Sequence, residues 1–447
     1  MTTAPDGAAP AGNAPGVGPT PPPADAAKDT GAWEKLVAAI GRGNPLVIAL
    51  SFLLAFVIGS LLIIIADQDV REAATYFFAR PQDTLIAIWD SITQAYLAML
   101  RGSIIDYKAD SLSRMLRPLT ETLTVATPLI IASCGMAVGF RAGLFNIGGT
   151  GQLIVGAMAA GYVGFTWQLP VVLHLLVALA AGVIAGGIWG GIAGFLKARF
   201  EANEVISTIM LNWIATYLLF YALKTDAFTG ENKAQPTSPS VRDTASLPGI
   251  LGDQYRLHLG LLIALGTAVL LWWLMSRSTL GFRFRAVGSN PRASEVAGIS
   301  TSRASFGVLL VAGALVGLAG AVHILGTEKR LTDGIAGSIG FDAITVALLG
   351  ASGPVGIVLA GLLFAALSTG GRFMETTQQV PLELVQVIQA LVVLFIAAPP
   401  LVRTIFGMNR TKKTGKRAKK STAGADGANA PTAPAAEQTV EKKGAER

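Results

Sequence analysis

The chain has 447 residues, of which 52% are hydrophobic and only 14% are charged, whereas soluble domains carry about a quarter charged residues. This composition excludes an ordinary soluble protein and predicts an all-α, polytopic membrane protein, because one bilayer-spanning helix needs about 20 mostly apolar residues. The formal net charge of +7 collects in the C-terminal tail and in short loops beside apolar segments, which indicates membrane topology and no nucleic-acid partner.

Both ends of the chain are predicted to be disordered tails in the cytoplasm. Residues 1–40 are rich in Ala, Pro and Gly and lack the pattern of a secretory signal. Residues 405–447 are Ala-, Pro-, Lys- and Glu-rich and cannot bury enough apolar surface to fold. Eight Lys or Arg lie between Arg403 and Lys420, which predicts that this end stays inside and contacts anionic membrane lipids.

The part between the tails, residues 41–404, is predicted to be a transmembrane domain that crosses the membrane ten times. The predicted spans are 45–66, 119–140, 152–168, 171–195, 205–223, 258–276, 304–326, 338–351, 354–371 and 384–404. With both termini inside, the arginine-rich loop 277–303 is cytoplasmic, as the positive-inside tendency requires. Segment 67–118 then lies outside although it is also basic, and its part 83–100 has the helical spacing of an interfacial amphipathic helix.

Glycines recur at helical spacing in two of these spans. Gly182, Gly186, Gly190 and Gly194 are four residues apart in the fourth span, and Gly313 and Gly317 repeat the spacing in the seventh. Small residues in a row let membrane helices approach closely. These stripes therefore predict helix packing and not a substrate site.

Two glycine-rich interruptions separate apolar runs in the two halves of the chain. The first, "FRAGLFNIGGTGQ" (140–152), includes the polar Asn146 and Gln152, and the second, "GIAGSIGFDAITVALLGASGPVG" (334–356), includes Asp342. Non-helical backbone at membrane depth survives only when it is buried in protein or lines a wet cavity. Paired broken segments are typical of binding sites in transporters built from repeats, although an ordinary turn between two helices also fits the first.

Four stretches carry a resemblance to a known family: "GLFNIGGTGQ" (143–152), "NEVISTIMLNWI" (203–214), "RAVGSNPRASEVAGIS" (285–300) and "GFDAITVALLG" (340–350). They resemble the permease subunits of bacterial ABC importers for nucleosides and simple sugars, which are akin to the branched-chain amino-acid and ribose permeases. The resemblance covers about 119–404. Family members more often have Glu at position 150 and His at position 203, where this chain has Thr and Asn.

The resemblance implies a subunit of the bacterial inner membrane that has no ATPase of its own. Its partners would be a cytoplasmic ABC ATPase subunit, a second permease subunit, which the family suggests is a different chain, and an extracytoplasmic solute-binding protein. The sequence agrees, since it has no G-x-x-x-x-G-K-[ST] loop. No cofactor is expected on this chain, and ATP and Mg would be used by the partner ATPase.

Loop 277–303 contains a predicted short helix that begins with Asn290 as N-cap and Pro291 as first residue and ends at Gly298. Ala293 and Val296 share one side of it. Such a helix resembles the coupling helix that docks into the ATPase subunit. The arginines of this loop have an equally good alternative explanation, which is that they fix the membrane topology or contact lipid head groups. The predicted coupling residues are Arg285, Gly288, Asn290, Pro291, Ala293, Val296 and Gly298.

For a neutral, hydroxylated solute such as a nucleoside, the pathway needs a few amide and hydroxyl groups and an aromatic face. The predicted pathway residues are Phe145, Asn146, Gln152, Asn212 and Asp342. Ser207 and Thr208 lie within about one and a half helical turns of Asn212. Their hydroxyl groups are more often hydrogen-bonded to the backbone of their own helix than exposed to a pathway.

Nucleosides are the first expectation for the cargo, with ribose- or galactose-type sugars as the alternative. An ion-coupled secondary carrier is a different class, but it would need membrane-embedded acids, of which Asp342 is the one candidate. A membrane enzyme would need an acid, base or metal constellation. Three widely spaced histidines and the single Cys134 form none.

Overall fold

The computed structural model describes residues 45–406, with 230–235 and 253 left out. The predicted N-terminal tail, 1–40, and the predicted C-terminal tail from residue 407 onward lie outside the described residues. In chain order the helices are α2 (Pro45–Ala66), α3 (Gln68–Thr75), α4 (Pro81–Ser103), α5 (Leu112–Arg141), α6 (Gly149–Thr166), α7 (Val171–Phe200), α8 (Glu204–Ala222), α9 (Gly260–Arg277), α10 (Thr279–Ser289), α11 (Pro291–Val296), α12 (Thr301–Val322), the π-helix η1 (His323–Glu328), α13 (Ile339–Leu349), α14 (Pro354–Gln378), α15 (Leu382–Ala397) and α16 (Pro399–Ile405).

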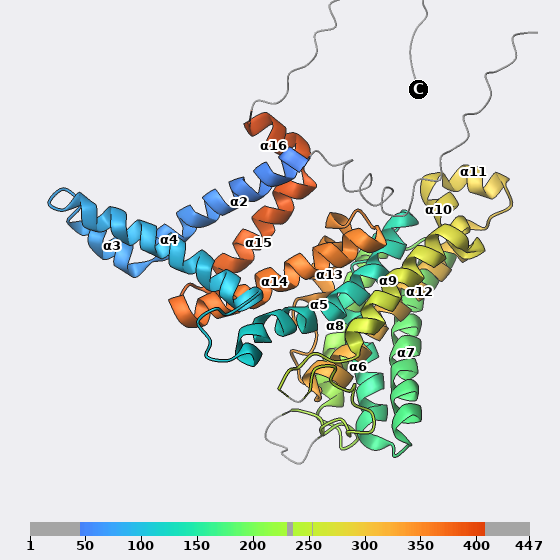
Figure 1. The fold of residues 1–447 in the computed structure, drawn as a ribbon. Helices are drawn as coiled ribbons and strands as arrows, with labels where there is room; N and C mark the ends of the chain where they lie inside the picture. Colours follow the sequence, from blue (N-terminus) through green and yellow to red (C-terminus); the bar gives the residue numbers. More distant parts are fainter. Residues whose placement is uncertain (1–44, 230–235, 253, 407–447) are drawn as a thin grey trace, which may run out of the picture.

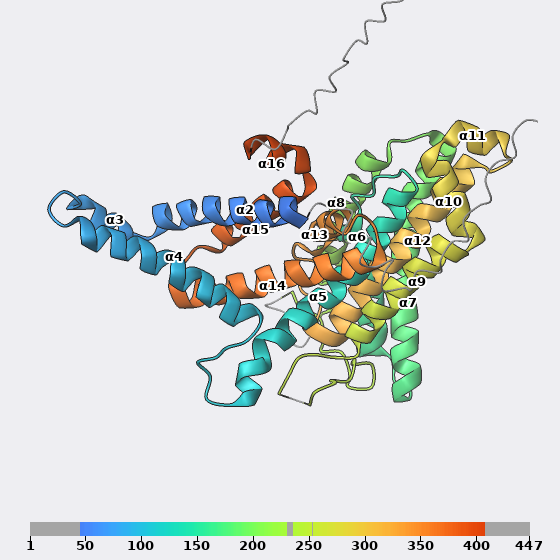
Figure 2. The same ribbon diagram turned by 45° about the horizontal axis from the view of Figure 1, so that its top comes forward.

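The described residues are all-α, as the sequence predicted, and fall into two groups of helices. Helices α5 to α13 form the main bundle, whereas α2, α3 and α4 project to one side with α15 beside α2 (Figures 1 and 2). Helix α14 joins the groups because it packs against both α4 and α5. The largest apolar core lies in the main bundle, and a smaller core around Met99, Met374 and Ile388 holds the projecting helices to α14.

Fewer helices than ten meet the requirements for a membrane span. Six described helices are long and apolar enough, or seven if the bent pair α2 and α3 counts as one span. The predicted span 338–351 is α13, whose 11 residues reach about 16 Å at 1.5 Å each, roughly half of a bilayer core. The predicted span 384–404 is divided into α15 and α16 at Pro399. The chain is a multi-pass membrane protein, but the count of ten is not confirmed.

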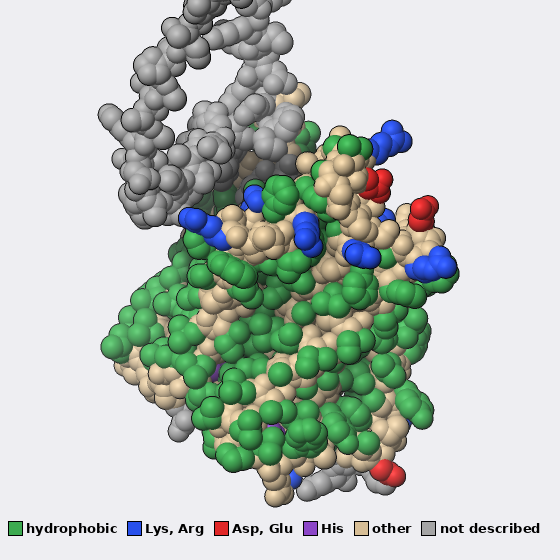
Figure 3. Space-filling model, turned by 90° about the vertical axis from the view of Figure 1, so that its right-hand side faces the viewer, with side chains coloured by type: hydrophobic (Ala, Val, Ile, Leu, Met, Phe, Trp, Pro, Cys, Tyr) green, Lys and Arg blue, Asp and Glu red, His purple; other side chains and the backbone are tan. Residues whose placement is uncertain are grey.

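The two ends of the main bundle differ in charge. Helices α10 and α11 lie at one end, and the loops between α8 and α9 lie at the other (Figure 1). Lys and Arg side chains gather along the α10–α11 border of a largely apolar surface (Figure 3). This distribution agrees with the predicted position of loop 277–303 on the positive side of the membrane.

The glycine stripes pack α7 directly against α12, as the sequence predicted. A Cβ on Gly186 would lie 2.5 Å from the Cα of Gly317 and 2.6 Å from the carbonyl oxygen of Gly313, and Gly194 similarly faces the backbone of Phe306. Main chain therefore touches main chain between these helices. Lipid gives helices no hydrophobic reason to associate, so this close fit is what stabilises the pair.

We expect Gly186→Ala to destabilise the folded protein by about 1–3 kcal/mol, because its new methyl group overlaps backbone that cannot move aside. Gly266→Ala is the matched control, since Gly266 lies in α9 with open space where a Cβ would be; it should be neutral or stabilise by up to about 1 kcal/mol. Thermal unfolding in detergent compares the two. Equal melting temperatures would contradict the packing account.

Candidate functional site

The first predicted interruption is a break between α5, which ends at Arg141, and α6, which begins at Gly149. Asn146 lies fully buried in this break, and its side-chain oxygen accepts a hydrogen bond of 2.9 Å from the backbone N–H of Gly148. Its amide nitrogen donates to Oε1 of Gln152 at 3.1 Å. The two polar side chains thus bond to each other and to the turn that begins α6.

Helix α8 supplies the remaining partners of the broken backbone. The side-chain oxygen of Asn212 accepts from the N–H of Gly151 at 2.8 Å, while its amide nitrogen donates to the carbonyl of Ile147 at 2.9 Å. Thr208 Oγ1 accepts from the N–H of Ile147 at 3.3 Å. These bonds satisfy backbone groups that no helix pairs and that lipid cannot solvate.

The second interruption meets the first inside the bundle. Between η1 and α13 the chain is non-helical over residues 329–338, and the first turn of α13 then packs on the first turn of α6. Gly340 approaches Thr150 so closely that a Cβ on the glycine would overlap the threonine backbone. The two breaks predicted in separate halves are therefore neighbours in space.

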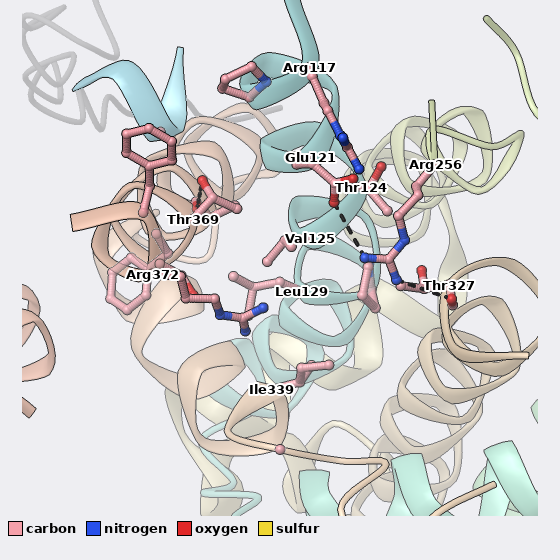
Figure 4. Close-up of a pocket in the computed structure, with 18 of the residues that line it drawn as sticks. Arg117, Glu121, Thr124, Val125, Leu129, Arg256, Thr327, Ile339, Thr369 and Arg372 are labelled. Atoms are coloured by element: carbon pink, nitrogen blue, oxygen red, sulfur yellow. Dashed lines mark hydrogen bonds and ion pairs between the residues drawn. The ribbon is translucent and has the colours of Figure 1, made fainter. Parts of the chain in front are cut away.

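A cavity of about 870 Å³ opens beside α13, between α5, η1 and α14. Small-molecule sites usually enclose about 300–1,000 Å³. Arg117, Glu121 and Arg256 lie on one side of the space and Arg372 on the other (Figure 4). The lining thus mixes both charges with apolar surface from α5, which suits a polar, uncharged solute.

Arg256 links three elements at the edge of this cavity. Its guanidinium lies 3.5 Å from the Glu121 carboxylate of α5 and donates to the Thr327 carbonyl of η1 at 3.3 Å (Figure 4). His258 fixes the same turn: its Nδ1 accepts from the N–H of Gly260, so Nε2 carries the proton and donates to Thr327 Oγ1 at 3.1 Å. Burial lowers the pKa of His258 to about 4, so the ring is neutral.

Two further polar groups face the cavity. His323 is the first residue of the π-helix, and its Nδ1 is buried without a hydrogen-bond partner among the described residues. Asp342, in the first turn of α13, accepts a 2.6 Å hydrogen bond from Ser338 Oγ. Buried polar atoms rarely lack partners in proteins, and short π-helices are frequent at functional sites. A solute hydroxyl or amide in the cavity would supply the missing partner.

Of the five predicted pathway residues, Asp342 lines this cavity and the other four lie elsewhere. Asn146, Gln152 and Asn212 form the buried hydrogen-bonded cluster described above. Phe145 is 41% exposed and packs its ring on Phe140. A part for these four in the pathway stays a prediction.

The predicted coupling element is helical in two pieces, α10 and α11. Asn290 is the N-cap of α11, where its side-chain oxygen accepts from the N–H of Ala293 at 3.1 Å, and Pro291 is the first residue. Gly298, at φ +80°, ends the turn. Val296 is 92% exposed, so the predicted apolar side of α11 has no cover within the described part of the chain.

Gly288, near the end of α10, joins this element to the first break. A Cβ there would lie 2.6 Å from the carbonyl oxygen of Arg141 and 2.7 Å from the carbonyl carbon of Ala142. Gly143, at φ +72°, faces the same glycine. Arg285 is exposed and its Nε donates to the carbonyl of Gly281 at 3.4 Å, in the preceding turn of its own helix.

Comparison with known proteins identifies the family. The family model described as the branched-chain amino acid transport system permease component matches residues 119–397. The chain belongs to this permease family. It is 41% identical over 296 residues to a guanosine ABC transporter permease of Bacillus subtilis, with 66% of this chain and 84% of that protein covered. No solved structure matches it.

Two other relatives of this permease are named for different cargoes. A glucose ABC transporter permease of Haloferax volcanii is 38% identical, with 62% of this chain and 75% of that protein covered. A nucleoside ABC transporter permease of Lactococcus lactis is 35% identical, with 67% and 86% covered. Bacillus subtilis and Lactococcus lactis each hold a second permease with the same named cargo, at 26% and 23% identity.

The charged cavity residues Arg117, Arg256 and Arg372 were not among the sequence-predicted site residues. A signal for Arg372 exists in the sequence, because it directly follows the apolar run of residues 354–371, and a charge within a membrane helix is a candidate for function. Arg256 lies in a loop and carries no such signal.

We expect Asn212→Leu to destabilise the permease by about 2–4 kcal/mol, since it leaves the Gly151 N–H and the Ile147 carbonyl unpaired at membrane depth. Ser207→Ala is the matched control on the same helix, because the Ser207 hydroxyl makes no hydrogen bond to any of the described residues. Thermal unfolding in detergent measures both. A Leu variant as stable as the Ala variant would show that these bonds do not hold the break.

Proposed function

We propose that this permease imports nucleosides across the bacterial inner membrane, driven by ATP hydrolysis in a separate subunit. The observation that carries the proposal is the similarity to two permeases named for guanosine and for nucleosides, each covered over more than four fifths of its length. The cavity supports it, since a nucleoside offers hydroxyl and amide groups to Asp342 and His323.

A simple sugar is the second candidate cargo. The Haloferax volcanii relative is named for glucose and is 38% identical to this chain. The cavity also favours this candidate in one respect, because Phe364 and Phe373 are its aromatic residues and Phe364 is buried. Phe373 is partly exposed, but the Arg101 guanidinium already lies over its ring, 5.4 Å from the centroid, so a base finds little free aromatic surface in the described lining.

The partner ATPase is proposed to grip α11. Ala293 and Val296 are exposed apolar residues on a helix whose start is fixed by Asn290 and Pro291. A short, rigid, exposed helix of this kind would transmit closure of the ATPase to α10. Because Gly288 of α10 packs against the backbone of Arg141, the movement would then reach α5. ATP and Mg would bind to the ATPase, and this chain would bind neither.

A second, different permease subunit is proposed to complete the pathway. Two relatives with the same named cargo in one organism, found in both Bacillus subtilis and Lactococcus lactis, support a mixed pair over two copies of this chain. A solute-binding protein is proposed to deliver the cargo at the end opposite α11, and both termini are proposed to be cytoplasmic.

Deleting the gene of this chain should abolish uptake of labelled guanosine and leave glucose uptake unchanged. Plasmid-borne wild-type chain should restore it. The Asp342→Asn variant should restore only about a tenth of the wild-type guanosine uptake. It loses a hydrogen bond to a charged carboxylate, which is worth about 1.5–3 kcal/mol. Asp333→Asn, in the exposed loop nearby, should restore it fully.

Loss of glucose uptake in the deletion strain, with guanosine uptake retained, would replace the nucleoside proposal by the sugar alternative. Full uptake through the Asp342→Asn variant would remove Asp342 from the pathway.

Ala293→Asp combined with Val296→Asp should abolish both guanosine uptake and co-purification of the ATPase in mild detergent, while the chain still inserts and folds. Two buried carboxylates at an apolar interface lack partners and are costly. Ile250→Asp combined with Leu251→Asp is the control, since these exposed apolar residues lie at the opposite end of the bundle. If the ATPase co-purifies equally with both double variants, α11 is not the docking element.

A further inference from the structure

A second groove, of about 610 Å³, lies on the outer side of α12 beside the coupling element. Most of its apolar lining comes from α10 and α12, namely Leu280, Phe284, Phe306, Leu310 and Val311, and residues 297–300 between α11 and α12 complete it. Gly307 deepens it, because a Cβ at this position would meet no atom closer than 3.5 Å, at the ring of Phe284. This groove is separate from the cavity beside α13 and plays no part in the proposed pathway.

Two arginines stand at the mouth of this groove. Arg283 of α10 and Arg303 of α12 are exposed, and neither guanidinium has an ion-pair or hydrogen-bond partner in the described structure. No Asp or Glu is among the described residues that line the groove. The carboxylate of Glu295, which accepts a 2.6 Å hydrogen bond from Thr301 Oγ1, does not line the groove. The mouth therefore attracts an anion.

The depth of the groove identifies the kind of ligand. Arg303 and Val311 are eight residues apart on α12, which is about 12 Å along a helix axis. Arg303 lies in the first turn of α12 and Val311 lies further along it, so the groove runs away from the α10–α11 end of the bundle, where Lys and Arg border the apolar surface (Figure 3), toward the middle of α12. A soluble partner cannot enter a membrane to that depth, whereas an acyl chain can.

We propose that this groove binds one anionic phospholipid, with its phosphate between Arg283 and Arg303 and part of an acyl chain along Phe284, Gly307 and Leu310. A basic pocket at the positive face of a membrane protein is a known kind of site for anionic lipid head groups. The bound lipid would bridge α10 and α12 and so hold the coupling element at a fixed height. The anionic lipids that surround the permease are the source of the ligand.

Binding of dioleoyl-phosphatidylglycerol to the purified full-length chain, measured by native mass spectrometry, tests the proposal. We expect one tightly retained molecule, and weaker retention of dioleoyl-phosphatidylcholine. Arg283→Gln combined with Arg303→Gln should weaken phosphatidylglycerol binding about thirtyfold, in line with the attraction of two basic residues for an anionic membrane. Gly307→Leu, which fills the groove and keeps both charges, should weaken it as well.

Arg199→Gln combined with Arg277→Gln is the matched control, because it removes the same charge from exposed arginines outside the groove. This double variant should bind phosphatidylglycerol like the wild type. Equal losses in the two double variants, or equal retention of phosphatidylcholine, would overturn the proposal. Competition by soluble glycerol phosphate, with no effect of Gly307→Leu, would mean an anion site without an acyl chain and would also overturn it.

Co-purification of the ATPase tests whether the ATPase, and not a lipid, binds the two arginines of the groove. If Arg283→Gln with Arg303→Gln abolishes co-purification of the ATPase and leaves phosphatidylglycerol binding unchanged, the arginines serve the partner and the lipid proposal fails. The nucleoside proposal is unaffected by any of these results, because lipid retention is measured without cargo or transport.

Discussion

The close contact of backbone with backbone at glycines is the constraint on which the rest of this membrane protein depends. Gly186 of α7 and Gly317 of α12 leave no room for a methyl group between the helices. In water, burial of large apolar side chains would hold such helices together, but lipid is as apolar as the side chains themselves. The fit of main chain to main chain supplies the missing attraction, and it places α6, α7 and α12 as one rigid block.

This rigid block makes it possible to break helices inside the membrane. The break before α6 is stabilised by side-chain amides, since Asn146 pairs with Gln152 and Asn212 binds the backbone on both sides of Gly148. Each amide offers both a donor and an acceptor, so it replaces a backbone partner of either kind. The break before α13 lies against the first one, at Gly340, and leaves Asp342 at the edge of the cavity.

The sequence predicted the features that depend on neighbouring residues and missed those that depend on distant ones. Asn290 and Pro291 predicted the start of α11 correctly, because capping is a property of four adjacent residues. The glycine repeat likewise predicted which face of α7 is packed. For Asn212, the sequence showed a polar residue at membrane depth but not its partner, which is 61 residues away in the chain.

The charged lining of the cavity illustrates the same limit. Arg117, Arg256 and Arg372 reach it from α5, from the loop before α9 and from α14, and their separation in the sequence hides that they share one space. Only the fold brings the pair of Arg256 and Glu121 together.

Helix α5 connects the two ends of the molecule that carry the chemistry. At its C-terminal end the carbonyl of Arg141 lies against Gly288 of the coupling element, and twenty residues earlier Glu121 holds Arg256 at the cavity. Twenty residues span about 30 Å of helix, the thickness of a bilayer core. Pro128 lies between these contacts and removes one backbone hydrogen bond. The same helix thus touches both the proposed ATPase-coupling element and the cavity. Pro128 is the one proline of α5 between these two contacts, and the turn it weakens is where the two ends can move relative to each other.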